Sequence, residues 1–293
     1  MGSQRSWQGL DSSCCRRGRC LFIFLLLALP LSATTYYVDC GGSDSNNGTG
    51  TSTAWQTIGK VNQSSFLAGD SVLFKAGCVW REQLTVPSSG APGKVVTVGA
   101  YGTGANPTIS GSDVMAEFSN GGSNIWDETS VTTEPQVLII NGALGRKVAS
   151  RSACGAPGTW FWTANTLSVY ATSNPSGTVE AAQRTYAIDT NSKTYLALQD
   201  IVVYGANNAG VYLRGDSNST VTRLVSKWNG YNGFMGRSID TITLEFCDAA
   251  YNGYYGYSFD SANSNITLTN STASYNARDG FMLDGVVGAM VSG

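Results

Sequence analysis

The pattern of apolar and polar positions repeats along the second half of the chain. Between residues 195 and 288 the same positions return after 23 or 24 residues, so that four successive units stand in register. Three apolar sets recur at this spacing. Their members are Leu198, Val221, Leu244 and Leu268, then Val211, Phe234, Tyr257 and Phe281, then Leu213, Gly236, Phe259 and Leu283. A fixed period in the low twenties indicates a solenoid, and we expect these sets to form inward-facing columns.

Each unit has the pattern of several short strands. Val, Ile, Thr, Tyr and Phe alternate with polar residues, and Gly and Asn separate the runs. No helical segment fits between the runs, and the Leu-x-x-Leu-x-Leu-x-x-Asn core of leucine-rich repeats is absent. The pattern predicts an all-β protein, a parallel β-helix in which each unit is one coil that pairs with the next. The regular coils are expected over about residues 186–288.

One polar set recurs at the same spacing and consists of Asn229, Asn252 and Asn276. Stacked identical amides hydrogen-bond from one coil to the next, and Asn tolerates the left-handed backbone of a tight corner. We therefore interpret this set as a structural ladder rather than as catalytic residues.

The first part of the chain predicts the beginning of the same domain, which would span residues 34–293. A strand begins at Tyr36, the first coils occupy residues 71–112, and a short helix over 54–62 is expected to form an amino-terminal cap. Residues 113–185 break the period and read as hairpin strands of an inserted β subdomain. The last coil has barely begun at Gly293, so we expect a truncated carboxyl terminus, and thus a fragment.

Residues 1–33 have the features of a signal peptide. Three Arg between residues 16 and 19 precede an apolar run at 21–29, and Leu31-Ser-Ala33 fits a cleavage end. The run is too short for a comfortable membrane span. We predict a secreted protein in the extracellular space, the periplasm or at the cell surface, with no stable membrane span after cleavage.

Charge and cysteine content narrow the classes further. The leader takes four of 18 basic and one of 20 acidic residues, which leaves a net charge of −5 and disfavours a nucleic-acid partner. The chain has no His, which excludes mechanisms that need imidazole and argues against zinc. Cys40 and Cys78 are candidates for a disulfide between the amino-terminal cap and the first coils, because export permits disulfides. Cys247 shares an apolar set and is predicted to be a small core residue.

One outward set carries charge. Asn191, Arg214, Arg237, Asp260 and Asp284 follow one another at spacings of 23 and 24, and we call them the charged column. Coils stand about 4.8 Å apart, so Arg214 and Arg237 suit a lyase that holds a uronate carboxylate or removes its α proton. Asp260 and Asp284 suit either Ca²⁺ binding or the paired carboxylates of a glycoside hydrolase. The alternative is a solvated ion-pair ladder of little energetic value.

Aromatic residues form a second candidate site. Trp228, Tyr251 and Tyr275 share one set, and Tyr231 and Tyr254 share another. Sugars pack on aromatic faces, so an exposed row along a solenoid would bind an extended polysaccharide. The alternative is packing at the corner beside the Asn ladder.

The sequence resembles secreted bacterial right-handed parallel β-helix proteins of the pectate-lyase-like superfamily. The resemblance rests on Asn-Ile-Thr-Leu-x-Asn followed by Tyr-Asn-x-x-Asp-Gly-Phe at 265–281, and on the opening segments Tyr36-Tyr-Val-Asp, Gly42-Ser-Asp-Ser-Asn-Asn-Gly, Trp55-Gln-Thr-Ile and Gly69-Asp-Ser-Val-Leu-Phe. It covers most of residues 34–293 and implies the fold more strongly than the function.

The resemblance implies a metal residue and a substrate class. Calcium-dependent lyases of this superfamily often carry acidic pairs at the corner where this chain has the single Asp279, and their Trp-Asp-Asp and Arg-His signatures are absent here. We expect a monomer that cleaves an extracellular polysaccharide by elimination or hydrolysis, with Ca²⁺ as the candidate cofactor. The alternative is a non-catalytic carbohydrate-binding or adhesion module.

Overall fold

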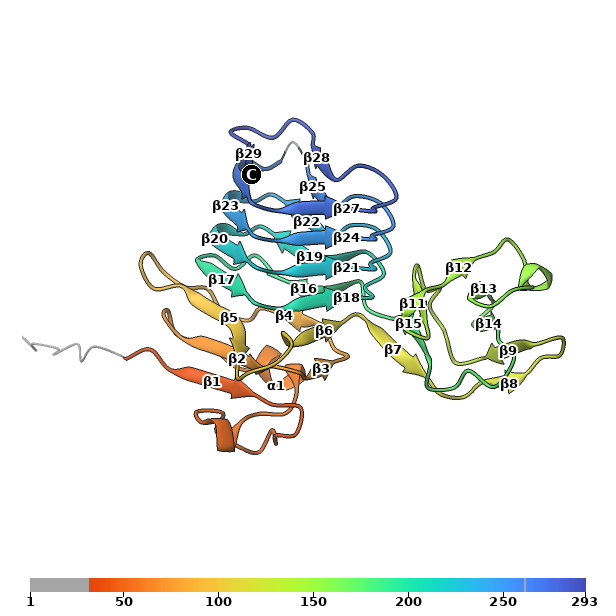
Figure 1. Cartoon of the computed structure of the whole chain (residues 1–293). Coiled ribbons are helices and arrows are strands. Elements are labelled where there is room, and N and C mark those ends of the chain that lie inside the picture. The colour runs from red at the N-terminus through yellow and green to blue at the C-terminus, as the bar shows by residue number, and fades with distance from the viewer. Residues whose placement is uncertain (1–31, 261) are drawn as a thin grey trace, which may run out of the picture. The chain divides into compact units, whose positions relative to one another are not determined.

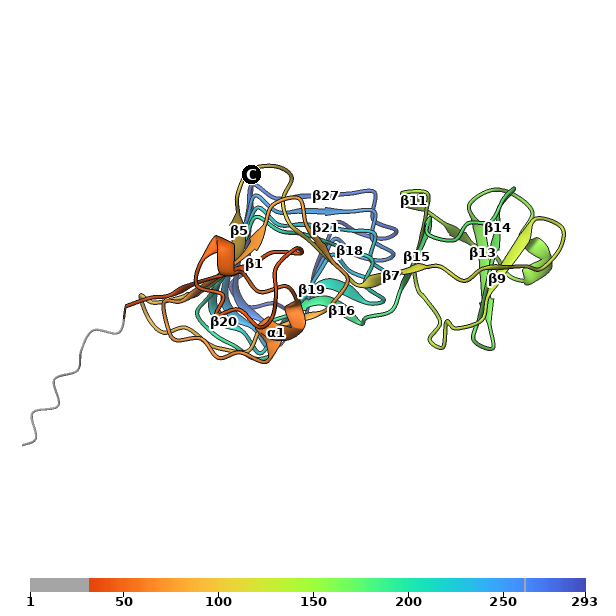
Figure 2. The ribbon, with the colours of Figure 1, turned by 90° about the horizontal axis from the view of Figure 1, so that it is seen from below.

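The chain folds as a mostly β structure with little helix. A computed structural model describes residues 32–260 and 262–293. Three parallel sheets, here named A, B and C, are built from strands that return to the same sheet once per coil. Figure 1 shows strands from successive coils stacked on one another, and Figure 2 shows the stack from below. The predicted β-solenoid is confirmed.

Sheet A has eight strands, and sheets B and C have six each. Sheet A contains β1 (Thr35–Val38), β2 (Ser71–Lys75), β5 (Val96–Tyr101), β17 (Leu196–Gln199), β20 (Ser217–Thr222), β23 (Asp240–Glu245), β26 (Ser264–Thr269) and β29 (Met290–Ser292). Sheet B contains β3 (Val79–Trp80), β6 (Thr108–Ser110), β18 (Val202–Tyr204), β21 (Val225–Lys227), β24 (Asp248–Ala250) and β27 (Thr272–Ser274). Sheet C contains β4 (Leu84–Thr85), β16 (Tyr186–Asp189), β19 (Ala209–Arg214), β22 (Phe234–Arg237), β25 (Tyr257–Phe259) and β28 (Phe281–Leu283).

The strand register confirms the predicted apolar columns. Leu198, Val221, Leu244 and Leu268 pair in order across sheet A, and all four are buried. The other two sets pair across sheet C. Gly236 is required in its column, because a Cβ there would lie 2.5 Å from the ring of Phe259 in the next coil. The period therefore reflects one continuous core.

The Asn ladder is confirmed, but its backbone conformation differs from the prediction. The Nδ2 of Asn229 donates to Asn252 Oδ1 at 2.9 Å, and the Nδ2 of Asn252 donates to Asn276 Oδ1 at the same distance. The left-handed residues are the aromatics just before the ladder, Trp228 (φ 53°), Tyr251 (φ 55°) and Tyr275 (φ 54°). The corner needs one residue with positive φ, and the Asn side chain is used for the ladder instead.

Residues 112–182 form two further sheets with mainly antiparallel pairing, where the period breaks. The first contains β7 (Ser112–Met115), β10 (Leu138–Ile140), β11 (Ala143–Leu144) and β15 (Val179–Ala182). The second contains β8 (Ser119–Asn120), β9 (Ile125–Glu128), β12 (Arg146–Lys147), β13 (Thr159–Thr163) and β14 (Thr166–Tyr170). They enclose a separate cluster of buried side chains that includes Leu138, Trp160 and Leu167.

The helix predicted over 54–62 is shorter than expected. The α-helix α1 covers Ile58–Asn62, and short 3-10 turns lie at Thr51–Thr53 and Arg151–Ala153. Ile58 and Val61 are buried in the solenoid core, but five residues do not establish a helical cap, which stays a prediction.

The cysteines behave as predicted. Cys40 and Cys78 form a disulfide, and Cys247 is buried as a free thiol in the core. The predicted signal peptide falls almost wholly outside the described residues. Among the helices that the structure describes, none is long and apolar enough to cross a bilayer.

Candidate functional site

The charged column lies along one edge of sheet C, meaning here the side where the carboxyl ends of its strands are aligned. Arg214 and Arg237 close β19 and β22 and pair in register. Asp260 and Asp284 directly follow β25 and β28, whose last residues also pair. The parallel register thus brings all four predicted catalytic residues to consecutive coils at one edge, as the spacing predicted.

Arg214 is held firmly in place. Its Nη2 donates to Asp189 Oδ2 at 2.9 Å and to Asn191 Oδ1 at 3.0 Å. The Arg214 side chain is 44% exposed, whereas the Asp189 side chain is only 8% exposed. The guanidinium carbon also lies 5.8 Å from the ring centroid of Tyr212. A charge-assisted bond to a buried carboxylate is stronger than a surface ion pair, so this arginine is fixed.

Arg237 and the two aspartates are looser. The Nε of Arg237 lies 3.8 Å from Asp260 Oδ2, which is beyond hydrogen-bonding distance, and the side chains are 64% and 41% exposed. Asp284 is exposed, and its backbone N–H donates to Phe259 O at 3.0 Å. One cation and two carboxylates are therefore accessible to a ligand at this edge.

Two tyrosines line the outward face of sheet C beside the column. The rings of Tyr186 and Tyr212 stack with centroids 4.4 Å apart, and Asp189 pairs with Tyr212 in register. Burial raises the pKa of Tyr186, and the nearby Tyr212 adds to the effect. The positive charges of Arg214 and Arg237 partly oppose this rise in the pKa of Tyr186, so both arginines act on the same hydroxyl.

The first aromatic set is less open than the sequence predicted. Tyr251 and Tyr275 stack face to face at 4.8 Å, so each covers one face of the other. Trp228 meets Tyr204 edge-on, and the Lys227 ammonium lies 4.4 Å from its ring centroid. The free surface consists mainly of ring edges and of Tyr275, which is 75% exposed.

The second aromatic set lies on the loops between sheets B and C. Tyr231 and Tyr254 are in tilted contact at 6.1 Å. The Arg278 guanidinium lies 4.6 Å from the Tyr254 ring and donates to the Tyr255 hydroxyl at 3.3 Å. Asp279 is exposed next to Arg278. It precedes β28, whereas Asp284 follows β28, so Asp279 and the charged column lie at opposite ends of the sheet C strands.

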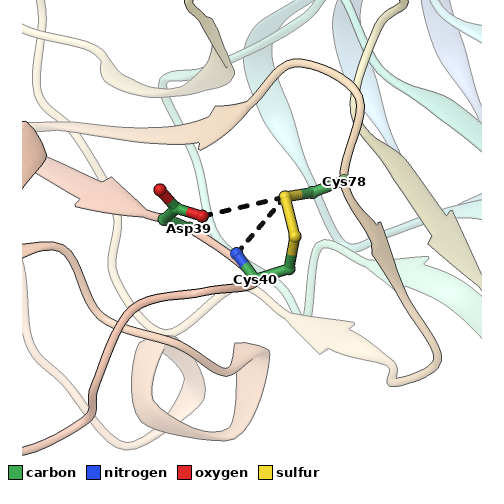
Figure 3. A group of neighbouring side chains, drawn as sticks. All are labelled: Asp39, Cys40 and Cys78. Carbon is green, nitrogen blue, oxygen red and sulfur yellow. Dashed lines mark hydrogen bonds between the residues drawn. A yellow bond between two sulfur atoms is a disulfide. The ribbon is translucent and has the colours of Figure 1, made fainter.

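The acidic residues predicted as calcium ligands lie apart from one another, so calcium binding stays a prediction. Calcium takes six to eight oxygens, but Asp260 and Asp284 lie at one edge of sheet C and Asp279 at the other. Within residues 32–260 and 262–293, one set of three possible metal-ligating side chains has its ligand atoms close together, and it consists of Asp39, Cys40 and Cys78. Figure 3 shows that these sulfurs form the disulfide, which leaves them no thiolate to donate to a metal.

Three surface hollows lie elsewhere. Two are lined by residues 121–178 and one by residues 40–82, so these three contain no residue of the charged column. The candidate site is open to solvent, since the side chains of Arg237 and Asp260 are 64% and 41% exposed.

Sequence reasoning missed Tyr186, Asp189 and Tyr212. Tyr212 belongs to an outward set with Met235, Ser258 and Met282, in which it is the one aromatic residue, so the set gives no signal for an aromatic site. Asp189 reaches Arg214 along a diagonal of the sheet, 25 residues away. The one available signal was position along the strand, since Asp189 and Tyr212 lie two residues before Asn191 and Arg214 of the charged column and therefore on the same face.

Comparisons with known proteins agree with the fold. Residues 181–290 match the family model described as "Right handed beta helix region". The solved complex of XylC with xylose has a TM-score of 0.62 at 12% identity, over 88% of this chain and 64% of that chain. A structure described as a glycoside hydrolase gives 0.54 at 8% identity, over 87% and 97%. A pectate lyase, Pel9A, gives 0.49 at 16% identity, over 87% and 51%.

No curated protein sequence matches this chain. The chain contains a right-handed β-helix region, and the likeness to XylC and to the glycoside hydrolase shows a shared fold. This chain spans less than two thirds of the length of the XylC chain.

Proposed function

We propose that this chain is a secreted carbohydrate-active β-helix protein that binds and cleaves an extracellular polysaccharide on the outward face of sheet C. The observation that carries the proposal is the charged column. It places the fixed Arg214, the open Arg237 and the carboxylates of Asp260 and Asp284 on consecutive coils. The β-helix neighbours include a complex with xylose and a glycoside hydrolase, which supports the carbohydrate class. The disulfide supports export.

Two reactions suit this arrangement. In a hydrolysis, Asp260 and Asp284 act as the acid and the nucleophile or base. Adjacent strands stand about 4.8 Å apart, close to the roughly 5 Å carboxylate separation of retaining enzymes. In an elimination, Arg237 neutralises a uronate carboxylate and thereby makes the α proton easier to remove. Asp260 or Asp284 accepts that proton, and the glycosidic oxygen leaves as the double bond forms. Both reactions use only side chains of this chain, because Asp260 and Asp284 lie at the other end of the sheet C strands from Asp279.

A panel of polysaccharides tests the proposal. New reducing ends together with the ultraviolet absorbance of unsaturated uronates identify a lyase, and reducing ends alone identify a hydrolase. Asp260→Asn and Asp284→Asn should each lower the rate of a hydrolase at least 100-fold, whereas Arg237→Gln should affect a lyase most. Arg223→Gln is the matched control, because Arg223 also pairs with an aspartate of the neighbouring coil, Asp200, but lies at the corner between sheets A and B. Equal losses in Arg223→Gln and in the column variants would refute the assignment of the site.

The second candidate function is a non-catalytic binding module. It is favoured by the exposed Tyr231 and Tyr275, which lie on the loops that lead into sheet C. In that case no substrate is cleaved, and the protein is retarded in gels that contain polymer. Tyr275→Ala would then weaken the retardation, while the column variants would leave it unchanged.

A further inference from the structure

Two neighbouring arginines of the charged column have opposite environments. Arg214 and Arg237 occupy the same position in consecutive coils, and their Cα atoms pair in register. Their position in the repeat gives no difference between the two arginines. In the structure, Arg214 has two side-chain acceptors within 3.0 Å, whereas the one carboxylate near Arg237 is 3.8 Å from its Nε.

The difference originates one coil before Arg214. Asp189 is the last residue of β16, and it lies on the outward face of sheet C, yet it is buried. The ring of Tyr212 is its neighbour in register, and Tyr186 stacks on that ring. A buried carboxylate needs a partner, because an unpaired charge in such surroundings is costly. The backbone N–H of Asn191 donates to Asp189 Oδ1 at 2.7 Å, and Arg214 supplies the opposite charge, with its Nη2 2.9 Å from Asp189 Oδ2.

The pairing settles how charge is distributed in the column. Asp189 neutralises Arg214 and holds its guanidinium beside the Tyr212 ring. Without that bond, two guanidinium groups on coils about 4.8 Å apart would repel each other. With it, Arg214 is held in an ion pair, whereas Arg237 has a carboxylate only at 3.8 Å and is free to move toward a ligand.

We infer that Asp189 is a positioning residue. It holds Arg214 in an ion pair at the site and leaves Arg237 as the arginine that contacts an anionic group of the bound saccharide. The inference rests on the proposed function for the identity of the ligand, but the restraint on Arg214 is a property of the protein alone. It therefore has one test without ligand and one with ligand.

The first test measures the mobility of the two guanidinium groups by ¹⁵N NMR of the Arg Nε–Hε signals. We expect slow Hε exchange and hindered rotation for Arg214 and fast exchange for Arg237. In Asp189→Asn, which keeps the shape but removes the charge, Arg214 should become as mobile as Arg237. Equal mobility of both arginines in the unmodified protein, or an Arg214 that stays restrained in Asp189→Asn, would overturn the inference.

The second test uses affinity electrophoresis with carboxymethyl cellulose, and with hydroxyethyl cellulose as its neutral counterpart. Arg237→Gln should weaken binding of the carboxylated polymer about tenfold, the value of one charge-assisted contact. In the Asp189→Asn background the same change should cost only about threefold, because the freed Arg214 replaces the lost cation. A merely structural pair would give the same loss from Arg237→Gln in both backgrounds, and that result would overturn the inference.

Controls separate this inference from the proposed function. Arg223→Gln should bind both polymers as the unmodified protein does, and circular dichroism should show that Asp189→Asn folds. If the protein binds neither polymer and cleaves none of the panel, the proposed function fails, and the NMR result alone decides whether Asp189 restrains Arg214.

Discussion

Asp216 is a buried carboxyl group whose ionisation should set the pH dependence of stability. It lies in the corner between β19 and β20, is 1% exposed, and accepts a 2.6 Å hydrogen bond from the Ser219 hydroxyl. Its second oxygen, Oδ2, is buried and has no hydrogen-bond partner. Burial raises the pKa of Asp216 from 3.8 to about 7, although the bond from Ser219 opposes the rise.

The magnitude follows from the change in pKa on folding. The pKa rises by about three pH units on folding, and each unit corresponds to about 1.4 kcal/mol. Below pH 3.8 the group is protonated in both states, so its ionisation takes nothing from the free energy of unfolding. Between that value and about pH 7 the unfolded chain loses its proton first, so stability falls as the pH rises. The total loss is about 4 kcal/mol, and it is complete above pH 7.

Urea unfolding of the unmodified protein and of Asp216→Asn, from about pH 4 to pH 8, measures this effect. The amide does not ionise, so the variant should gain about 4 kcal/mol relative to the unmodified protein across that range. An amide suits such a corner, since Asn263 donates from Nδ2 to Gly236 O at 2.9 Å in a later coil. A constant offset at all pH values would reflect lost hydrogen bonds alone. Parallel stability curves would therefore refute a raised pKa at Asp216.

Three further predictions concern stability and binding. Asn252→Ala should lower the free energy of unfolding by about 3 kcal/mol, because it leaves the buried backbone N–H of Asn229 without an acceptor and removes one of the two acceptors of its Nδ2. Denaturant unfolding with the exposed Asn218→Ala as control measures this, and a loss no larger than the control's would contradict it. Replacing both Cys40 and Cys78 by Ala should cost about 4 kcal/mol, because their disulfide closes a loop with a sequence separation of 38; the unmodified protein in reductant should match the variant, and a mismatch would count against the loop argument. Tyr251→Gly should change the melting temperature little, because relief of the left-handed backbone of about 1 kcal/mol offsets the lost stacking on Tyr275; calorimetry checks this, and a large drop would show that the stack matters more than the strain.

The fold was predictable because residues one period apart in the sequence of a solenoid are neighbours in adjacent coils. Leu198 and Val221 pair in space because they are one coil apart, so spacing alone identifies neighbours. The same rule located Arg214 beside Arg237 and Asp260 beside Asp284. The ladder of Asn amides followed in the same way.

The remaining features depend on side-chain orientation, which spacing does not encode. Asp189 reaches Arg214 because the guanidinium turns back toward the preceding coil rather than forward toward the coil of Arg237. The stacking of Tyr251 on Tyr275, which closes their ring faces, follows from a left-handed corner that the pattern assigned to the Asn residues. Residues 112–182 lack the period, and their pairing was predictable only as hairpins.

The corners of the coils differ in how they treat changes of length. Sheet A leads into sheet B over the same short step in every coil after residue 196, from 199 to 202, 222 to 225, 245 to 248 and 269 to 272. The extra residue that changes the period from 23 to 24 enters between β25 and β26, at the edge of sheet C that carries Asp260. The long non-periodic segment enters between β6 and β16, before sheet C begins its next strand. One corner is thus constant, while both edges of a single face accept new residues without disturbing the core. A lineage of such proteins can remodel what that face recognises by lengthening its borders, and a designer could graft loops at the same two places.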